Sequence, residues 1–188
     1  MKKISLIIAI LFFAAESFSQ TTSPAYKVVS VISKESFYLN GGARAMVGGR
    51  SRTYLQVTLP PNTVEWYYAL TSTPNQGQNS SIGLASQLLK LIDPVGGVAE
   101  SAISSIITPT GAGVCDVFLM SDQNSVMRYV NKQPGQPQTI MSATRENFRQ
   151  GVVNVKDIIS GTHFLVFRNP SAMQGINLTV EVAAIVRE

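Results

Sequence analysis

The sequence predicts a mainly β protein, an antiparallel β-sandwich of jelly-roll type with a short helical pair inserted at about residues 82–107. Two observations support this fold class. Most apolar residues fall in short alternating or β-branched runs separated by Pro, Gly and Asn, which is the pattern of strands and turns. Strands and helices do not alternate along the chain, which argues against the strand-helix-strand units of a parallel sheet.

The amino terminus predicts export, because residues 1–19 have the features of a secretory signal peptide. A Lys-Lys start precedes an apolar run over 4–15, and the small residues Ser17 and Ser19 follow. The run is shorter than the roughly 20 residues of a membrane-spanning helix. We expect cleavage after Ser19, no stable transmembrane anchor, and a mature protein in the periplasm, at the cell surface or outside the cell. A mature chain that opens at Gln20 resembles exported proteins of the Bacteroidetes.

Composition excludes several classes of protein. The 15 basic and 11 acidic residues give a formal charge of only +4, without the clustered charge that nucleic-acid binding requires. One Cys and one His exclude an internal disulfide and a multi-histidine metal centre, and no metal or cofactor is expected. The length is that of one domain, so residues 20–188 are expected to form a single β-sandwich.

The first strands follow from β-branched and alternating runs. Residues 26–33 form one expected strand, and 36–39 form another. Residues 53–59 and 64–70 alternate on either side of Pro60-Pro61-Asn62, which predicts a β-hairpin across a proline turn.

The spacing of apolar residues becomes helical after residue 81. Leu84 and Leu88 recur at helical spacing behind a possible Ser81 cap, which predicts a helix over 82–92 and a second over 98–107. We expect this pair to pack over one end of the sandwich and close its core. The alternative is an exposed hairpin that enters a membrane or joins a neighbouring subunit.

The second half of the chain returns to strands. The run at 163–168 is apolar on both faces, which predicts a central buried strand. The run at 176–187 alternates over its whole length and requires a partner strand. The remaining expected elements are strands at 115–120, 139–141 and 152–155 and a short helix or turn at 122–131.

Three of these runs, in order, resemble the later half of pre-peptidase C-terminal domains and GOLD-like sandwiches of secreted bacterial proteins. They are DVFLM at 116–120, GTHFLVFRNP at 161–170 and INLTVEVAAIV at 176–186. The resemblance covers about 53–71 and 114–187 and implies a secreted β-sandwich. The sequence departs from that family in carrying the helical pair and no peptidase domain, so an accessory role to a protease does not follow. It is also similar to uncharacterised secreted Bacteroidetes proteins, which implies no assigned activity.

Two groups of residues are candidate ligand contacts. Trp66 and Tyr68 share one face of a strand and are expected in the core, whereas Tyr67 is expected to be exposed beside Tyr54 on the neighbouring strand. Such an aromatic pair stacks sugar rings or only stabilises its sheet. The glycine-rich segment 41–52 carries the second group, Arg44, Arg50 and Arg52. These arginines either grip a carboxylate or phosphate or belong to a solvated hairpin.

No catalytic constellation is evident. His163 has no nucleophile or carboxylate near it in sequence and is expected to be structural, and Cys115 is expected to be a buried thiol, with an intermolecular bridge as the alternative. A hydrolase would require two dispersed carboxylates to converge in a cleft. The candidates are Glu65, Glu100, Asp116, Asp157 and Glu181.

These observations favour an exported, non-catalytic binding module that recognises a carbohydrate or an envelope protein. The alternative is a membrane-active or assembly-forming protein that uses the apolar helical hairpin 82–107. Exposure of its leucines and isoleucines on the folded surface would favour that alternative.

Overall fold

The computed structural model describes residues 25–188 with the exception of 75–80, 94–96 and 99. The expected signal peptide and its cleavage after Ser19 lie outside the described residues. None of the helices within the described ranges is long and apolar enough to cross a membrane.

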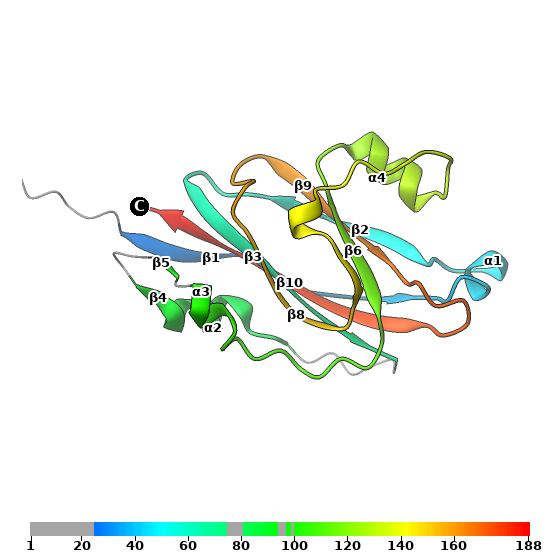
Figure 1. The fold of residues 1–188 in the computed structure, drawn as a ribbon, viewed down its shortest axis with the longest axis horizontal. Helices are drawn as coiled ribbons and strands as arrows, with labels where there is room; N and C mark the ends of the chain where they lie inside the picture. The colour runs from blue at the N-terminus through cyan, green and yellow to red at the C-terminus, as the bar shows by residue number, and fades with distance from the viewer. Residues whose placement is uncertain (1–24, 75–80, 94–96, 99) are drawn as a thin grey trace, which may run out of the picture.

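The described residues form two four-stranded antiparallel sheets that pack face to face, as Figure 1 shows. This arrangement confirms the predicted β-sandwich. Sheet A has the order β1 (Tyr26–Leu39), β10 (Ile176–Arg187), β3 (Thr63–Thr73) and β8 (Gln150–Val155). Sheet B has the order β2 (Arg52–Thr58), β9 (Thr162–Arg168), β6 (Cys115–Met120) and β7 (Arg145–Phe148).

The main core lies between the two sheets. Trp66 and Tyr68 of β3 are fully buried there, as predicted from their shared face. Each polar atom of these rings has a partner, because Trp66 Nε1 donates to the Ile158 carbonyl at 2.7 Å and Tyr68 Oη donates to the Ala143 carbonyl at 2.6 Å. Burial therefore leaves neither ring with an unpaired donor.

A helical insertion covers the outer face of sheet A. It consists of α2 (Leu84–Leu91), the short strands β4 (Ile92–Asp93) and β5 (Gly97–Val98), and α3 (Glu100–Ile103). Leu84 and Leu88 are buried against outward-facing residues of sheet A, including Tyr67 and Ala183. The prediction that this segment packs at one end of the sandwich is wrong, because it lies flat on a sheet face. The second predicted helix, 98–107, is reduced to the four residues of α3.

A second helix, α4 (Gln123–Val130), covers the outer face of sheet B. It begins where the sequence predicts, because the Asp122 carboxylate accepts hydrogen bonds from the backbone N–H groups of Asn124 and Ser125. Val126 then packs on Phe118 and the rest of an outer apolar cluster. A short helix, α1 (Arg44–Val47), lies at the opposite end of the molecule from the carboxyl terminus in Figure 1.

Two local predictions are wrong, and one strand has no counterpart among the predicted elements. The runs at 53–59 and 64–70 do not form a hairpin, because β2 belongs to sheet B and β3 belongs to sheet A. The expected strand at 139–141 is irregular and leads into a 3-10 turn, η1 (Met141–Ala143). The strand β7 follows that turn and was not predicted, because its sequence Arg-Glu-Asn-Phe has no apolar alternation and is extended through pairing with β6.

Candidate functional site

An open groove of about 650 Å³ lies beside β8. We call it the edge groove, since β8 is the last strand of sheet A. One wall comes from the helical insertion through Ile103, Ser104 and Ile106, and the other comes from Ser142 and Arg145 beside β7. The floor is the strand itself and the residues that follow it, from Gly151 to Asp157.

The backbone of β8 presents unused hydrogen-bonding groups to this groove. The Ser72 N–H donates to the Arg149 carbonyl at 2.9 Å, and the pairing of β3 with β8 continues from there without a register shift. Because backbone groups alternate in an antiparallel ladder, those of Gly151 and Val153 point toward β3, and those of Val152 and Asn154 point toward the open edge. No described residue hydrogen bonds to the backbone of Val152 or Asn154 on that side.

The other sheet edges are less suited to accept a new strand. β1 has register shifts near Ile32 and carries Lys34 and Glu35, and such bulges and charges block edge pairing. β7 has four residues, two of them charged, and β2 lies along β1 at the side of the sandwich. By contrast, β8 has the uncharged sequence Gln-Gly-Val-Val-Asn-Val.

The Asn154 side chain links the groove to the sheet. Its Nδ2 donates to Glu65 Oε2 at 3.0 Å and to Tyr67 Oη at 3.2 Å, while its buried Oδ1 has no hydrogen-bond partner. The side chain of Asn154 on the floor of the groove is therefore held in one orientation by β3. The sequence indicated a strand at 152–155 but not a site. The available signal was a strand rich in valine that carries none of the charged residues or prolines that commonly protect a sheet edge.

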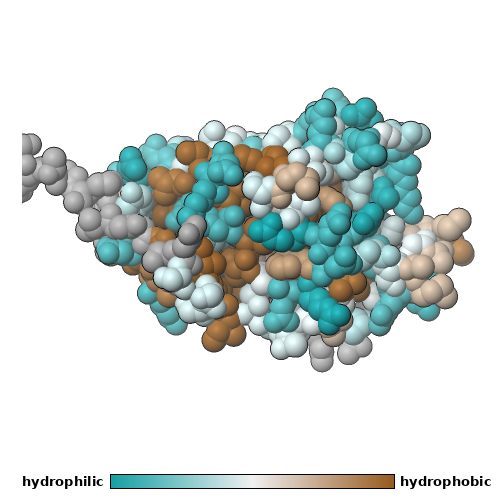
Figure 2. Space-filling view, in the orientation of Figure 1, coloured by the Kyte–Doolittle hydropathy of each residue, from teal (hydrophilic) through white to brown (hydrophobic). Residues whose placement is uncertain are grey.

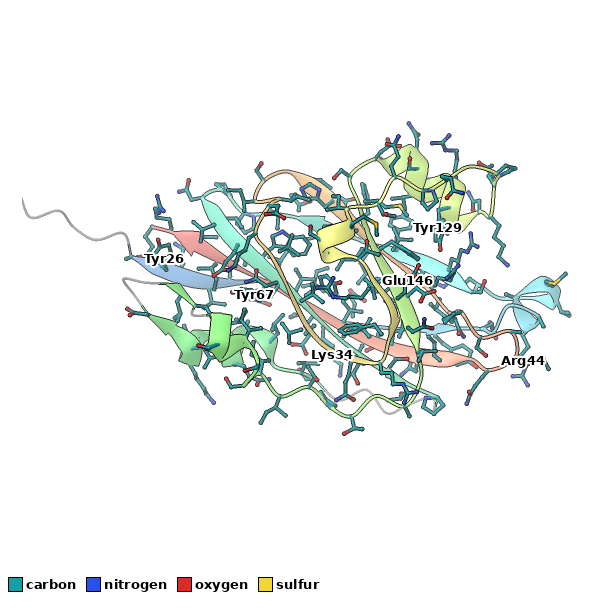
Figure 3. All side chains as sticks on the ribbon, viewed as in Figure 1. Tyr26, Lys34, Arg44, Tyr67, Tyr129 and Glu146 are labelled. Carbon is teal, nitrogen blue, oxygen red and sulfur yellow. The ribbon has the colours of Figure 1, made fainter. Side chains whose placement is uncertain are left out.

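The expected aromatic platform is not formed. Tyr67 is fully buried beneath the helical insertion, at the middle of sheet A in Figure 3. Tyr54 is half-buried on the outer face of sheet B, where its ring packs edge-on against Phe164 with centroids 5.9 Å apart. The expectation that the two tyrosines form an exposed neighbouring pair is wrong, because their strands belong to different sheets.

The three arginines of the glycine-rich segment have different surroundings. Arg44 is exposed on α1 and Arg50 is exposed before β2. Arg52 alone has fixed contacts: its Nη1 donates to the Tyr129 carbonyl at 2.7 Å, and its guanidinium lies 4.3 Å from the centroid of the Tyr129 ring. Arg44 and Arg52 line different cavities, so these two side chains do not share one site.

His163 and Cys115 have structural surroundings. His163 is buried, and its ring lies between Ser121 Oγ at 2.9 Å and the Ser160 carbonyl at 2.7 Å. A carbonyl can only accept, so Nε2 carries a proton and donates to the Ser160 carbonyl. Sequence spacing did not reveal Ser121, and neither member of this pair lines a described cavity. Cys115 is fully buried, and burial raises the pKa of its thiol above the usual range.

The dispersed carboxylates have separate partners. Glu65 accepts from Asn154, Asp116 pairs with Arg168, and Glu181 accepts from the start of the helical insertion. Asp157 is exposed at the end of the edge groove, and the side chain of Glu100 lies outside the described part of the chain. Within that part, no group of three or more His, Cys, Asp or Glu side chains is arranged to hold a metal ion.

Fold and groove together define a β-sandwich with one open, uncharged sheet edge beside a walled groove. A scan of the chain against family models finds no match, and a search of the curated proteins finds none either.

Proposed function

We propose that this protein is an exported, non-catalytic binding module that holds an extended segment of an envelope protein along the open edge of β8. The single observation that carries the proposal is the edge groove, in which the backbone groups of Val152 and Asn154 face a cavity of about 650 Å³. Addition of a strand to a sheet edge is a recurring mode of peptide recognition, with affinity from main-chain hydrogen bonds and specificity from pockets for alternate side chains.

The walls of the groove indicate the chemistry of the segment. Successive side chains of an added strand point to opposite faces of sheet A. Those on the outer face meet Ile103, Ile106 and Val152, which are apolar. Those on the inner side meet Ser142 and the guanidinium of Arg145, which are polar and cationic. The preferred ligand is therefore an extended segment in which apolar residues alternate with acidic or polar ones.

The structure favours a polypeptide over a carbohydrate as the ligand. The expected sugar-stacking platform depended on an exposed Tyr67 ring, and that ring is fully buried. Burial of Leu84 and Leu88 also argues against the alternative of a membrane-active hairpin, because the apolar face of α2 is already used by sheet A.

A displayed library of random short peptides, selected on purified residues 20–188, tests the proposal, with a polysaccharide panel in parallel. The diagnostic variant is Val152→Pro, which removes an edge-facing N–H without removing a ladder bond to β3. We expect selected peptides to alternate apolar and acidic residues and to bind the variant about tenfold more weakly, as loss of one hydrogen bond predicts.

Ser33→Pro is the matched control, because Ser33 is exposed and falls in the irregular part of β1 that has no register partner in β10. It introduces the same residue into another edge strand and should leave peptide binding unchanged. Equal binding to wild type and Val152→Pro, or saturable binding to polysaccharides with none to peptides, would overturn the proposal.

A further inference from the structure

A second cavity, of about 360 Å³, lies at one end of sheet B. It shares no lining residue with the edge groove. Three cationic side chains line it: Arg52 from β2, Arg168 from β9 and Lys132 from the turn after α4. The rest of the wall is formed largely by the backbone segments at 42 and 169–172. We call this cavity the basic pocket.

Arg52 and Arg168 are direct register partners in the pairing of β2 with β9. Like charges at directly opposite positions destabilise a sheet unless an anion compensates them. Asp116 compensates Arg168, since its Oδ2 lies 2.6 Å from Arg168 Nε and 2.5 Å from Nη2. Within the described part of the chain, no carboxylate forms an ion pair with Arg52 or Lys132. The pocket therefore keeps an excess of positive charge.

The cations are held in place before any ligand arrives. The Asp116 carboxylate, which is almost fully buried, fixes Arg168 and also accepts from the Asn147 N–H at 2.8 Å. The carbonyl and ring of Tyr129 fix Arg52. Pre-set guanidinium groups lose little conformational entropy when they bind an oxyanion.

Hydrogen bonds also hold the backbone wall of the pocket. Asn169 is buried, its Oδ1 accepts from the Ser171 N–H at 3.0 Å, and its Nδ2 donates to the Leu39 carbonyl. The adjoining chain passes so close that a Cβ on Gly41 would lie 2.6 Å from the Met173 carbonyl carbon, which explains the glycine there.

We propose that the basic pocket binds a phosphate group. Three cations exceed the two negative charges near them, Asp116 in its ion pair with Arg168 and the exposed Glu146, which also acts on Arg168. Two guanidiniums with a lysine match the several acceptor oxygens of a multiply charged oxyanion. Next to the pocket, α1 presents Met46 and Val47 with 84% and 94% of their surface exposed, visible as the apolar end of the molecule in Figure 2. The phosphate therefore belongs either to a lipid headgroup or to a soluble ligand, and both sources share this chemistry.

Inorganic phosphate is the first probe, measured by calorimetry against sulfate and acetate at matched ionic strength. The diagnostic variant is Lys132→Asn. Lys132 has a φ of +57°, a left-handed conformation that Asn tolerates well, so the change removes the charge without straining the turn. We expect phosphate affinity to fall about tenfold, as for one lost charged contact. Arg44→Gln is the matched control, because Arg44 is exposed on α1 and does not line the pocket.

Vesicle flotation distinguishes the two sources. Binding to phosphatidylglycerol vesicles that is lost in both Lys132→Asn and Met46→Ser assigns a lipid headgroup, whereas phosphate binding without vesicle binding assigns a soluble phosphorylated ligand. The proposal is overturned if wild type shows no saturable phosphate binding, if Lys132→Asn binds as well as wild type, or if acetate binds as tightly as phosphate. None of these results depends on the edge groove.

Discussion

The Glu181 carboxylate on β10 accepts the backbone N–H of Leu84, the first residue of α2, at 2.8 Å. The same buried side chain accepts from the Ile82 N–H at 2.7 Å and from the Ser81 hydroxyl at 2.8 Å. A carboxylate in the middle of sheet A thus satisfies the free donors at the start of the helix that covers that sheet. This contact fixes the position of the insertion, and the insertion supplies one wall of the edge groove.

Glu181→Ala should destabilise the fold, because it leaves buried N–H groups at Ile82 and Leu84 without an acceptor. The expected loss is about 2–4 kcal/mol, given about 1–3 kcal/mol for each unsatisfied buried group and partial relaxation of the helix end. Urea unfolding measures it. Glu35→Gln on the exposed part of β1 is the control and should change the unfolding free energy by less than about 0.5 kcal/mol. Similar values for the two variants would show that Glu181 does not anchor the insertion.

Trp66 is the single tryptophan, so its fluorescence reports directly on the core. Because the ring is fully buried, native emission should be blue-shifted and should move to longer wavelength on unfolding. Trp66→Ala should cost about 3–5 kcal/mol, as for other large-to-small core changes. Trp66→Phe keeps an aromatic ring but loses the bond to the Ile158 carbonyl, so it should cost less. An unchanged unfolding midpoint for the alanine variant would contradict the core assignment.

Stability should fall at alkaline pH because of Cys115. Burial, together with the neighbouring Asp116 charge, raises the pKa of the native thiol above the usual range. Above about pH 8.5 the unfolded thiol loses its proton while the native thiol keeps it, so the native state binds more protons and the unfolding free energy decreases with pH. The slope contributed by this group is at most about 1.4 kcal/mol per pH unit.

Denaturant unfolding between about pH 7.5 and 9 tests this sign, because tyrosines of the unfolded chain titrate mainly above that interval. Cys115→Ala should show a shallower decline than wild type over the same interval. An equal slope in both proteins would mean that the thiol is not protected. A thiol reagent provides a second check, because the native protein should react slowly and the unfolded protein rapidly.

The arginines of the glycine-rich segment should differ in their contributions to stability. Arg44→Ala and Arg50→Ala remove exposed side chains and should change the unfolding free energy by less than about 0.5 kcal/mol. Arg52→Ala loses a hydrogen bond and a ring contact at Tyr129, partly offset by relief of repulsion from Arg168, for a net cost of about 1 kcal/mol. Thermal unfolding of the three variants side by side measures the difference. If Arg52→Ala leaves the stability unchanged, the contacts of Arg52 with Tyr129 do not stabilise the fold.

The fold was predictable where local pattern and final environment agree. The run at 163–168 is apolar on both faces and became the central strand β9, and the run at 176–187 became β10 between two partners. The segment 122–131, expected to be a short helix or a turn, contains the helix α4, and Asp122 caps its start. In these segments periodicity or capping chemistry determines the element without help from distant residues.

The sequence did not reveal which sheet each strand joins or what covers an outer face. The alternation of side chains along a strand is the same whether the outer face of the sheet is exposed to solvent or covered by another segment. The pattern therefore predicted an exposed Tyr67. One signal was available: the run Trp-Tyr-Tyr-Ala-Leu at 66–70 is apolar or aromatic on both faces, as expected of a strand buried on both sides. The basic pocket had no local signal, because Arg52, Lys132 and Arg168 come from three distant segments.

Amide hydrogen exchange along β8 tests the central claim most directly. In the free protein the amides of Gly151 and Val153 should be protected by β3, and those of Val152 and Asn154 should exchange quickly because they face the open edge. On addition of a selected alternating peptide, Val152 and Asn154 should gain protection while the first pair stays unchanged. A peptide that binds without protecting those two amides would contradict strand addition at β8.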